Sequence, residues 1–85
     1  MTVKAKEQAL ADRLEAQEAL KLRGYTAAAL PEGGVLIDRW GHARGLWHFS
    51  PKGFSWTPAG YNEPICRVDD VEEAVRYTLI VLDNH

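Results

Sequence analysis

Apolar residues near the N-terminus of the chain recur at the spacing of a helix. Leu10 and Leu14 fall on one face of a segment that is rich in Ala, Leu, Glu and Lys and contains no Pro or Gly. The pattern predicts a helix over about 3–23, ended by the glycine that follows. Lys4 and Glu7 are spaced to pair along its surface. The apolar stripe is narrow, so this helix is expected to cover a core on one side only.

After position 24 the pattern changes from helical spacing to short β-prone runs separated by turn residues. Strands are predicted at about 34–40, 45–50, 54–57 and 65–68, with a further possible strand at 25–30. The connections between these runs are short. They are typical of an antiparallel meander, because parallel strands need longer crossovers.

The last segment, VDDVEEAVRYTLIVLDNH, returns to helical spacing. Asp69 or Asp70 can cap its N-terminus, and Glu72 or Glu73 three residues later completes a capping box. Apolar residues then recur along one face, which predicts a helix over about 70–82.

Together these elements predict the α+β class. We expect residues 1–85 to form a single small domain with an N-terminal helix, an antiparallel β-meander of three to five strands and a C-terminal helix packed on one face of the sheet. A chain of this length buries somewhat over ~60% of the surface that its unfolded form exposes, so the core is thin.

The aromatic residues gather around one predicted turn. If Ser50–Gly53 forms that turn, Phe49 faces Phe54 and Trp47 faces Trp56 across a hairpin. Alternation then places all four rings on one side of the sheet, where the two helices can cover them. The four rings are therefore expected to form a core, and the alternative is an exposed platform for a ligand.

The preceding strand should add Val35 and Ile37 to the same face. This requires an odd number of residues, three or five, in the connection between positions 41 and 45. An even number would instead turn Leu36 and Asp38 inward and bury a carboxylate, which is unfavourable without a partner.

Trp40 falls outside this ladder of rings. Alternation places it at the end of its strand on the far face, near Arg39, His42 and Arg44. Trp and Arg are enriched among residues that dominate binding energies, so this group is a candidate contact surface. The alternative is a ring folded over the hairpin end and stacked against an arginine.

A second candidate surface lies on the C-terminal helix. Tyr77, Ile80 and Val81 fall outside its main apolar stripe, and a helix that is apolar nearly all round is buried on more than one side. A partner protein or a second copy of the chain could cover them, giving a homodimer. The alternative is that the N-terminal helix and the segment 25–30 cover them.

Residues typical of catalysis or cofactor binding are scarce. Cys66 is the only cysteine, the three histidines lack the spacing of a zinc site, and no phosphate-binding glycine loop is present. We therefore expect no enzyme activity, no metal and no cofactor. The charged N-terminus, the single cysteine and the absence of a long apolar run favour a cytoplasmic protein without a membrane segment.

These features favour a small interaction protein, an accessory, regulatory or inhibitory factor that contacts a larger protein or associates with itself. Small proteins of this kind are common in phages and mobile elements. One alternative is a nucleic-acid-binding module that uses Arg39, Trp40 and Arg44. The formal net charge of −2 disfavours this alternative.

Another alternative is a local acidic mimic of nucleic acid. It would use the carboxylates of Asp69, Asp70, Glu72 and Glu73. Capping of the helix explains the same residues without a partner.

Overall fold

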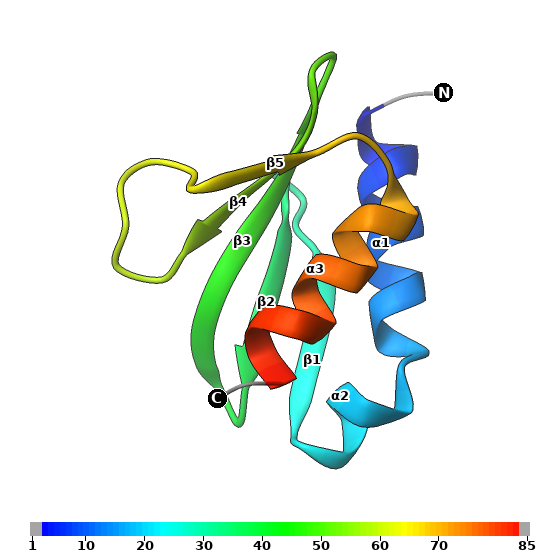
Figure 1. Ribbon diagram of the computed structural model, residues 1–85, viewed down its shortest axis with the longest axis vertical. Helices are drawn as coiled ribbons and strands as arrows, with labels where there is room; N and C mark the ends of the chain where they lie inside the picture. Colours follow the sequence, from blue (N-terminus) through cyan, green and yellow to red (C-terminus); the bar gives the residue numbers. More distant parts are fainter. Residues whose placement is uncertain (1–2, 84–85) are drawn as a thin grey trace.

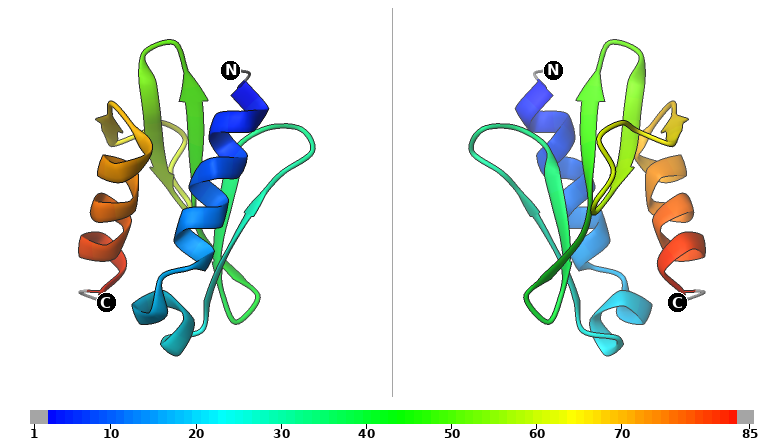
Figure 2. Two further views of the ribbon diagram at one scale, coloured as in Figure 1. Left: turned by 90° about the vertical axis from the view of Figure 1, so that its right-hand side faces the viewer. Right: turned by 90° about the vertical axis from the view of Figure 1, so that its left-hand side faces the viewer.

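Two layers make up the protein: helices pack on one face of an antiparallel sheet (Figures 1 and 2). The computed structural model describes residues 3–83. Its elements are α1 (Val3–Glu15), α2 (Glu18–Leu22), β1 (Tyr25–Ala29), β2 (Val35–Arg39), β3 (His42–Ser50), β4 (Gly53–Pro58), β5 (Cys66–Val68) and α3 (Val71–Asp83). The predicted α+β fold with an antiparallel meander is confirmed, and the sheet has five strands, the largest number in the predicted range of three to five. Among the described residues, no helix is both long enough and apolar enough to cross a membrane.

The strands pair in sequence order, β1-β2-β3-β4-β5, and every pair is antiparallel. The segment at 25–30, predicted only as a possible strand, forms β1 and pairs with β2 along its whole length. β3 is longer than predicted: it begins at His42 instead of position 45, because the turn before it contains only two residues. The limits of the other strands lie within one residue of the prediction.

The prediction that an odd number of residues connects β2 and β3 is wrong. Trp40 and Gly41 alone form the turn, and a β-bulge follows: Asp38 pairs with Ala43, but Ile37 pairs with Gly45, so Arg44 is an extra residue in β3. The two turn residues and the one bulged residue together shift the alternation of β3 by three positions, as a three-residue turn would. Val35 and Ile37 are therefore buried, as predicted.

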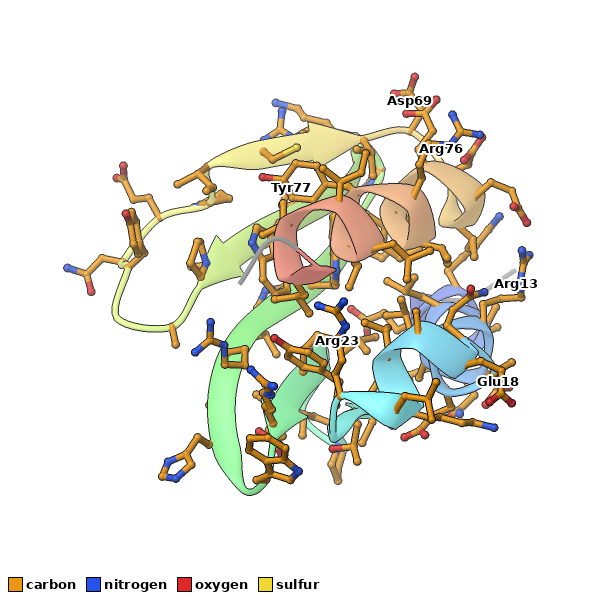
Figure 3. The ribbon with its side chains drawn as sticks, turned by 60° about the horizontal axis from the view of Figure 1, so that its bottom comes forward. Arg13, Glu18, Arg23, Asp69, Arg76 and Tyr77 are labelled. Carbon is orange, nitrogen blue, oxygen red and sulfur yellow. The ribbon has the colours of Figure 1, made fainter. Side chains whose placement is uncertain are left out.

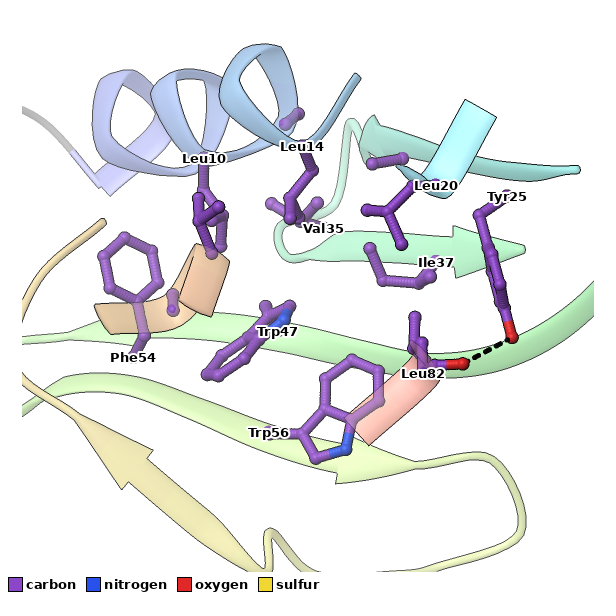
Figure 4. Packing of buried hydrophobic residues seen from close by; sticks show 14 residues of the cluster. Leu10, Leu14, Leu20, Tyr25, Val35, Ile37, Trp47, Phe54, Trp56 and Leu82 are labelled. Carbon is purple, nitrogen blue, oxygen red and sulfur yellow. Dashed lines mark hydrogen bonds between the residues drawn. The ribbon is translucent and has the colours of Figure 1, made fainter. Parts of the chain in front are cut away.

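The ladder of aromatic rings is confirmed as core. Trp47 pairs with Trp56 and Phe49 with Phe54. The ring centroids of the two pairs lie 5.3 and 4.8 Å apart. Trp47, Phe54 and Trp56 are buried and Phe49 is half-buried against them, so the rings face the helices (Figure 4). The exposed platform is ruled out.

The single helix predicted over 3–23 is two helices. Gln17 has an extended backbone, with φ −80° and ψ 114°, and it separates α1 from α2. A straight helix would direct Gln17 and Lys21 toward the core. The break changes the direction of the chain, so Leu20 is buried in their place.

Glu7 does not pair with Lys4 on the surface, as its spacing predicts, but is buried under the sheet. One carboxylate oxygen accepts a hydrogen bond of 2.9 Å from the N–H of Gly34, and the other accepts one of 3.1 Å from the N–H of Phe49. Buried backbone donors need acceptors, and here a side chain supplies them. Glu7 thus ties α1 to the start of β2 and to the end of β3.

α3 buries one face, and a hydroxyl lies in the middle of it. Thr78 donates a hydrogen bond of 2.8 Å to the carbonyl of Ala74 and accepts one of 2.9 Å from the indole N–H of Trp47. The helix begins one residue later and ends one residue later than the predicted 70–82.

The two edge strands differ in length. β5 has three residues, whereas β1 has five and its edge runs beside α1. On this outer edge the N–H of Ala27 donates a hydrogen bond of 3.0 Å to the carboxylate of Glu15.

Candidate interaction surface at the turn between β2 and β3

Trp40 stands in a backbone conformation that is unusual for its residue type. It and Gly41 form a two-residue hairpin turn with φ values of +50° and +83°. This is the pattern of a type I′ turn, in which Asn, Asp and Gly are favoured. Trp40 is the only described non-glycine residue with positive φ. Its side chain is 71% exposed.

The Trp40 ring lies close to Gly24 and to Arg39. A Cβ on Gly24 would lie 2.0 Å from Nε1 of Trp40, so a side chain at position 24 would displace the indole from this place. The guanidinium carbon of Arg39 lies 4.3 Å from the centroid of the Trp40 ring and 5.1 Å from that of Tyr25. Nε of Arg39 also donates a hydrogen bond of 2.8 Å to the carbonyl of Arg23. The exposed indole is therefore held against its own domain.

We call Gly24, Arg39, Trp40, Gly41 and His42 the Trp40 tip. It lies at the end of the molecule where the chain passes from α2 into β1 (Figure 1). The predicted far-face position of Trp40 is wrong, because Trp40 belongs to the turn and not to the strand. Exposure as a contact surface and stacking on an arginine were predicted as alternatives for Trp40. Both are found, since the ring is exposed and also stacked on Arg39. His42 is exposed beside it.

Arg44 was predicted to join this group, but it is the extra residue of the bulge in β3. It lines a different recess together with Trp56, Val81 and Leu82, on the side of the sheet that carries α3. Arg23, which the sequence did not single out, extends from the end of α2 toward α3 (Figure 3).

The candidate surface on α3 is smaller than predicted. Ile80 is 58% exposed, whereas Tyr77 and Val81 are half-buried against the core. The Tyr77 ring meets Trp47 edge-on, with the centroids 5.8 Å apart. Burial, with a smaller contribution from Cys66, raises the pKa of the Tyr77 hydroxyl. Self-association through this helix stays a prediction that rests on Ile80.

Most of the acidic candidates have partners inside the chain. Asp70 caps α3 by accepting a hydrogen bond of 2.9 Å from the N–H of Glu73, and the N–H of Asp69 donates one of 3.4 Å to the Glu73 carboxylate. Glu72 pairs with Arg13 of α1. The hydrogen bond from Arg13 lowers the pKa of Glu72 and raises that of Arg13. This pairing leaves the acidic mimic with little support.

Exposed apolar side chains also occur where the sequence predicted no site. They are Leu22, Tyr61 and Ile65. The face of the sheet opposite the helices carries a recess of about 420 Å³ between Leu46 and the connection that contains Tyr61. The sequence did not predict this recess. Tyr61 lies in a loop that contains Pro and Gly, and such a loop has no periodicity that would show which face of the sheet the tyrosine lies against.

Within residues 3–83, no three or more His, Cys, Asp and Glu side chains gather where they could hold a metal ion. His85 lies outside the described residues. The chain matches no protein-family model, no curated protein and no solved structure at a significant level.

Proposed function

We propose that this protein is a non-enzymatic protein-binding module that contacts its partner through the Trp40 tip, with the indole of Trp40 as the anchor. Such a module acts as an accessory, regulatory or inhibitory factor toward a larger protein. The observation that carries the proposal is an exposed tryptophan in a left-handed turn, with its ring packed against Arg39 and Gly24.

This arrangement is unfavourable for folding alone. A non-glycine residue in the left-handed region costs roughly 1–2 kcal/mol, and the exposed indole recovers little of this through burial. Its stack on Arg39 returns about 0.5–1 kcal/mol, the usual value for an exposed cation–π pair. Asn or Gly at position 40 would form the turn with less strain, so folding does not account for the tryptophan.

The same arrangement suits binding. A side chain that is already fixed loses little conformational entropy when a partner covers it. Trp and Arg are the side chains most enriched at the centres of protein interfaces, and the tip offers Trp40 with Arg39 behind it. The matching partner is a protein surface with an apolar pocket for the indole and carboxylates near it for Arg39 and His42.

Nucleic acid is a weaker candidate partner. The ladder of aromatic rings faces the helices and leaves none of its rings free to stack on bases. Arg44 lines a recess with Trp56 and Val81, whereas Arg39 stacks on Trp40, so the proposed basic and aromatic residues belong to different parts of the surface.

The test compares capture of proteins from the source cell by the wild type and by Trp40→Asn. Asn tolerates the turn, so this variant should stay folded, with a free energy of unfolding within about 1 kcal/mol of the wild type. It should lose the partner that the wild type retains. Tyr61→Asn, which removes another exposed ring, is the matched control and should retain it.

Equal capture by the wild type and Trp40→Asn would reject the tip as the binding surface. A gel shift of DNA or RNA that weakens steeply with salt and is lost in Arg39→Ala would favour the nucleic-acid alternative instead.

A further inference from the structure

A recess on the side of the sheet that carries α3 is lined in part by Arg44, the extra residue of the β3 bulge. It lies between Arg44, Trp56, Tyr61, Ile65, Val81 and Leu82 and has a volume of about 240 Å³. We call it the Trp56 recess. Bulges commonly redirect a side chain next to a functional site. Here the extra residue is Arg44, whose side chain shares the recess with the end of α3 instead of following the far-face alternation of β3.

A buried donor without an acceptor borders this recess. Trp56 is only 2% exposed, and its Nε1 is the one buried side-chain nitrogen or oxygen among the described residues that has no hydrogen-bond partner. The equivalent atom of the neighbouring Trp47 is bonded to Thr78. A buried, unpaired N–H costs about 1–3 kcal/mol, so it is a place where an acceptor from outside would stabilise the protein.

The chain leaves space for the Trp56 ring in this orientation. A Cβ on Gly45 would lie 2.4 Å from two carbons of the ring, so a side chain at position 45 would displace it. Figure 4 shows the ring next to Leu82, with its nitrogen at the lower edge, farthest from α1.

The chemistry of the lining indicates the kind of ligand. The lining residues with polar side chains are Arg44, Trp56 and Tyr61, and no Asp or Glu is among the described lining residues. The walls formed by Ile65, Val81 and Leu82 are apolar. Side chains that can donate hydrogen bonds, next to apolar walls, fit a molecule with an anionic acceptor at one end and an apolar body.

The size of the recess limits that body. A cavity of about 150 Å³ holds a benzene molecule, and drug-sized sites begin near 300 Å³. The recess lies between these values, which fits one ring with a short acidic side chain.

We infer that the Trp56 recess binds small monocarboxylic acids with a single apolar or aromatic group. The carboxylate lies against Arg44 and accepts the hydrogen bond of the Trp56 indole after a small adjustment of the ring. The C-terminal end of α3 disfavours an anion nearby, so binding depends on the charge of Arg44. This site is independent of the Trp40 tip.

The experiment titrates the intact protein with phenylacetate while the indole N–H resonances of the three tryptophans are followed by NMR. Trp56→Phe assigns the resonance of Trp56. We expect that resonance to shift and saturate below about 20 mM, the range expected for a ligand of so few atoms. The resonance of Trp47, whose acceptor is internal, should stay in place.

Two comparisons define the chemistry. Arg44→Gln should weaken phenylacetate binding about tenfold or more, the effect of losing a charge-assisted hydrogen bond, whereas Arg67→Gln on β5 should leave it unchanged. Phenylacetamide, which has the same shape without the charge, should bind more weakly than phenylacetate. The inference is overturned by an absence of saturable shifts at Trp56, by equal binding to Arg44→Gln, or by equal binding of the amide.

Discussion

At the scale of single residues, Gly24 and Trp40 depend on each other although sixteen positions separate them. The indole needs the space that Gly24 leaves, and the N–H of Trp40 donates a hydrogen bond of 3.3 Å to the carbonyl of Gly24. Gly24 also ends α2 with φ +83°, where an L-residue is strained. One glycine thus serves both the helix end and the exposed ring.

This dependence leads to a prediction for Gly24→Ala. The left-handed conformation alone should reduce the free energy of unfolding by about 1–2 kcal/mol, and the clash with the indole should add to the loss. Gly60→Ala is the matched control, because Gly60 has φ +87° and a Cβ there would meet no atom within 4 Å. Urea unfolding measures the losses, and the Trp40 indole resonance reports movement of the ring. Equal losses and an unmoved resonance would contradict the proposed contact.

The sequence contains part of this local information. A residue followed by glycine between two β-prone runs indicates a two-residue hairpin turn, and WG at 40–41 fits that rule. Tryptophan is not among the residues favoured in the first position of such a turn. The alternation of apolar and polar residues in the preceding strand therefore decides the prediction, and it places Trp40 in the strand. Burial of Glu7 was not predictable from spacing, because its partners, the N–H groups of Gly34 and Phe49, are far away along the chain.

At the scale of elements, the helices are joined to the sheet by individual polar contacts as well as by apolar packing. Thr78 on α3 and Trp47 on β3 form one of these contacts in the core. Trp47 is fully buried, so solvent does not reach its indole N–H, and loss of the acceptor would leave this donor unpaired.

Thr78→Val should therefore reduce the free energy of unfolding by about 1–3 kcal/mol, although valine has nearly the same shape as threonine. Thr57→Val, on the face of the sheet away from the helices, is the control and should change it by less than about 0.5 kcal/mol. Thermal or chemical unfolding of the three proteins gives the comparison. A Thr78→Val protein as stable as the wild type would show that Trp47 finds another acceptor.

Element types were predictable from periodicity, whereas two irregularities, the break at Gln17 and the bulge at Arg44, were not. The register of the aromatic hairpin followed from the position of the turn at Ser50–Gly53. Which side chains of β2 face the core followed from the need to bury Val35 and Ile37. The bulge was not visible in the sequence pattern. A two-residue turn plus one bulged residue buries the same side chains of β2 and β3 as a turn with an odd number of residues would. Because the bulge positions Arg44, the Trp56 recess was not predictable either.

At the scale of the whole molecule, an ion pair on the surface joins the N-terminal and C-terminal helices. Arg13 of α1 and Glu72 of α3 are fifty-nine positions apart in the chain and are partly exposed. The pair lowers the pKa of Glu72 in the folded protein, so folding and the ionisation of this carboxylate favour each other.

The pH dependence has a definite sign. The contribution of Glu72 is present above the pKa of this carboxyl in the unfolded chain and is lost as the pH falls through its lower pKa in the folded protein. Between neutral pH and about pH 3, the wild type should therefore lose slightly more stability than Glu72→Gln, which has no carboxylate to protonate. Glu18→Gln is the control and should follow the wild type in urea unfolding at each pH. The difference should shrink at high salt, because the pair is exposed.

The hydrogen bond between Glu15 and the N–H of Ala27 has a consequence for the protein at high concentration. β1 is the longer of the two edge strands, and its small side chains would let a strand of another molecule approach and extend the sheet. The Glu15 carboxylate already occupies one of the donors that such a strand would need, and it presents a negative charge to the incoming backbone. The chain thus protects its own edge against growth into sheet-like aggregates, using a residue from the helix that covers its core.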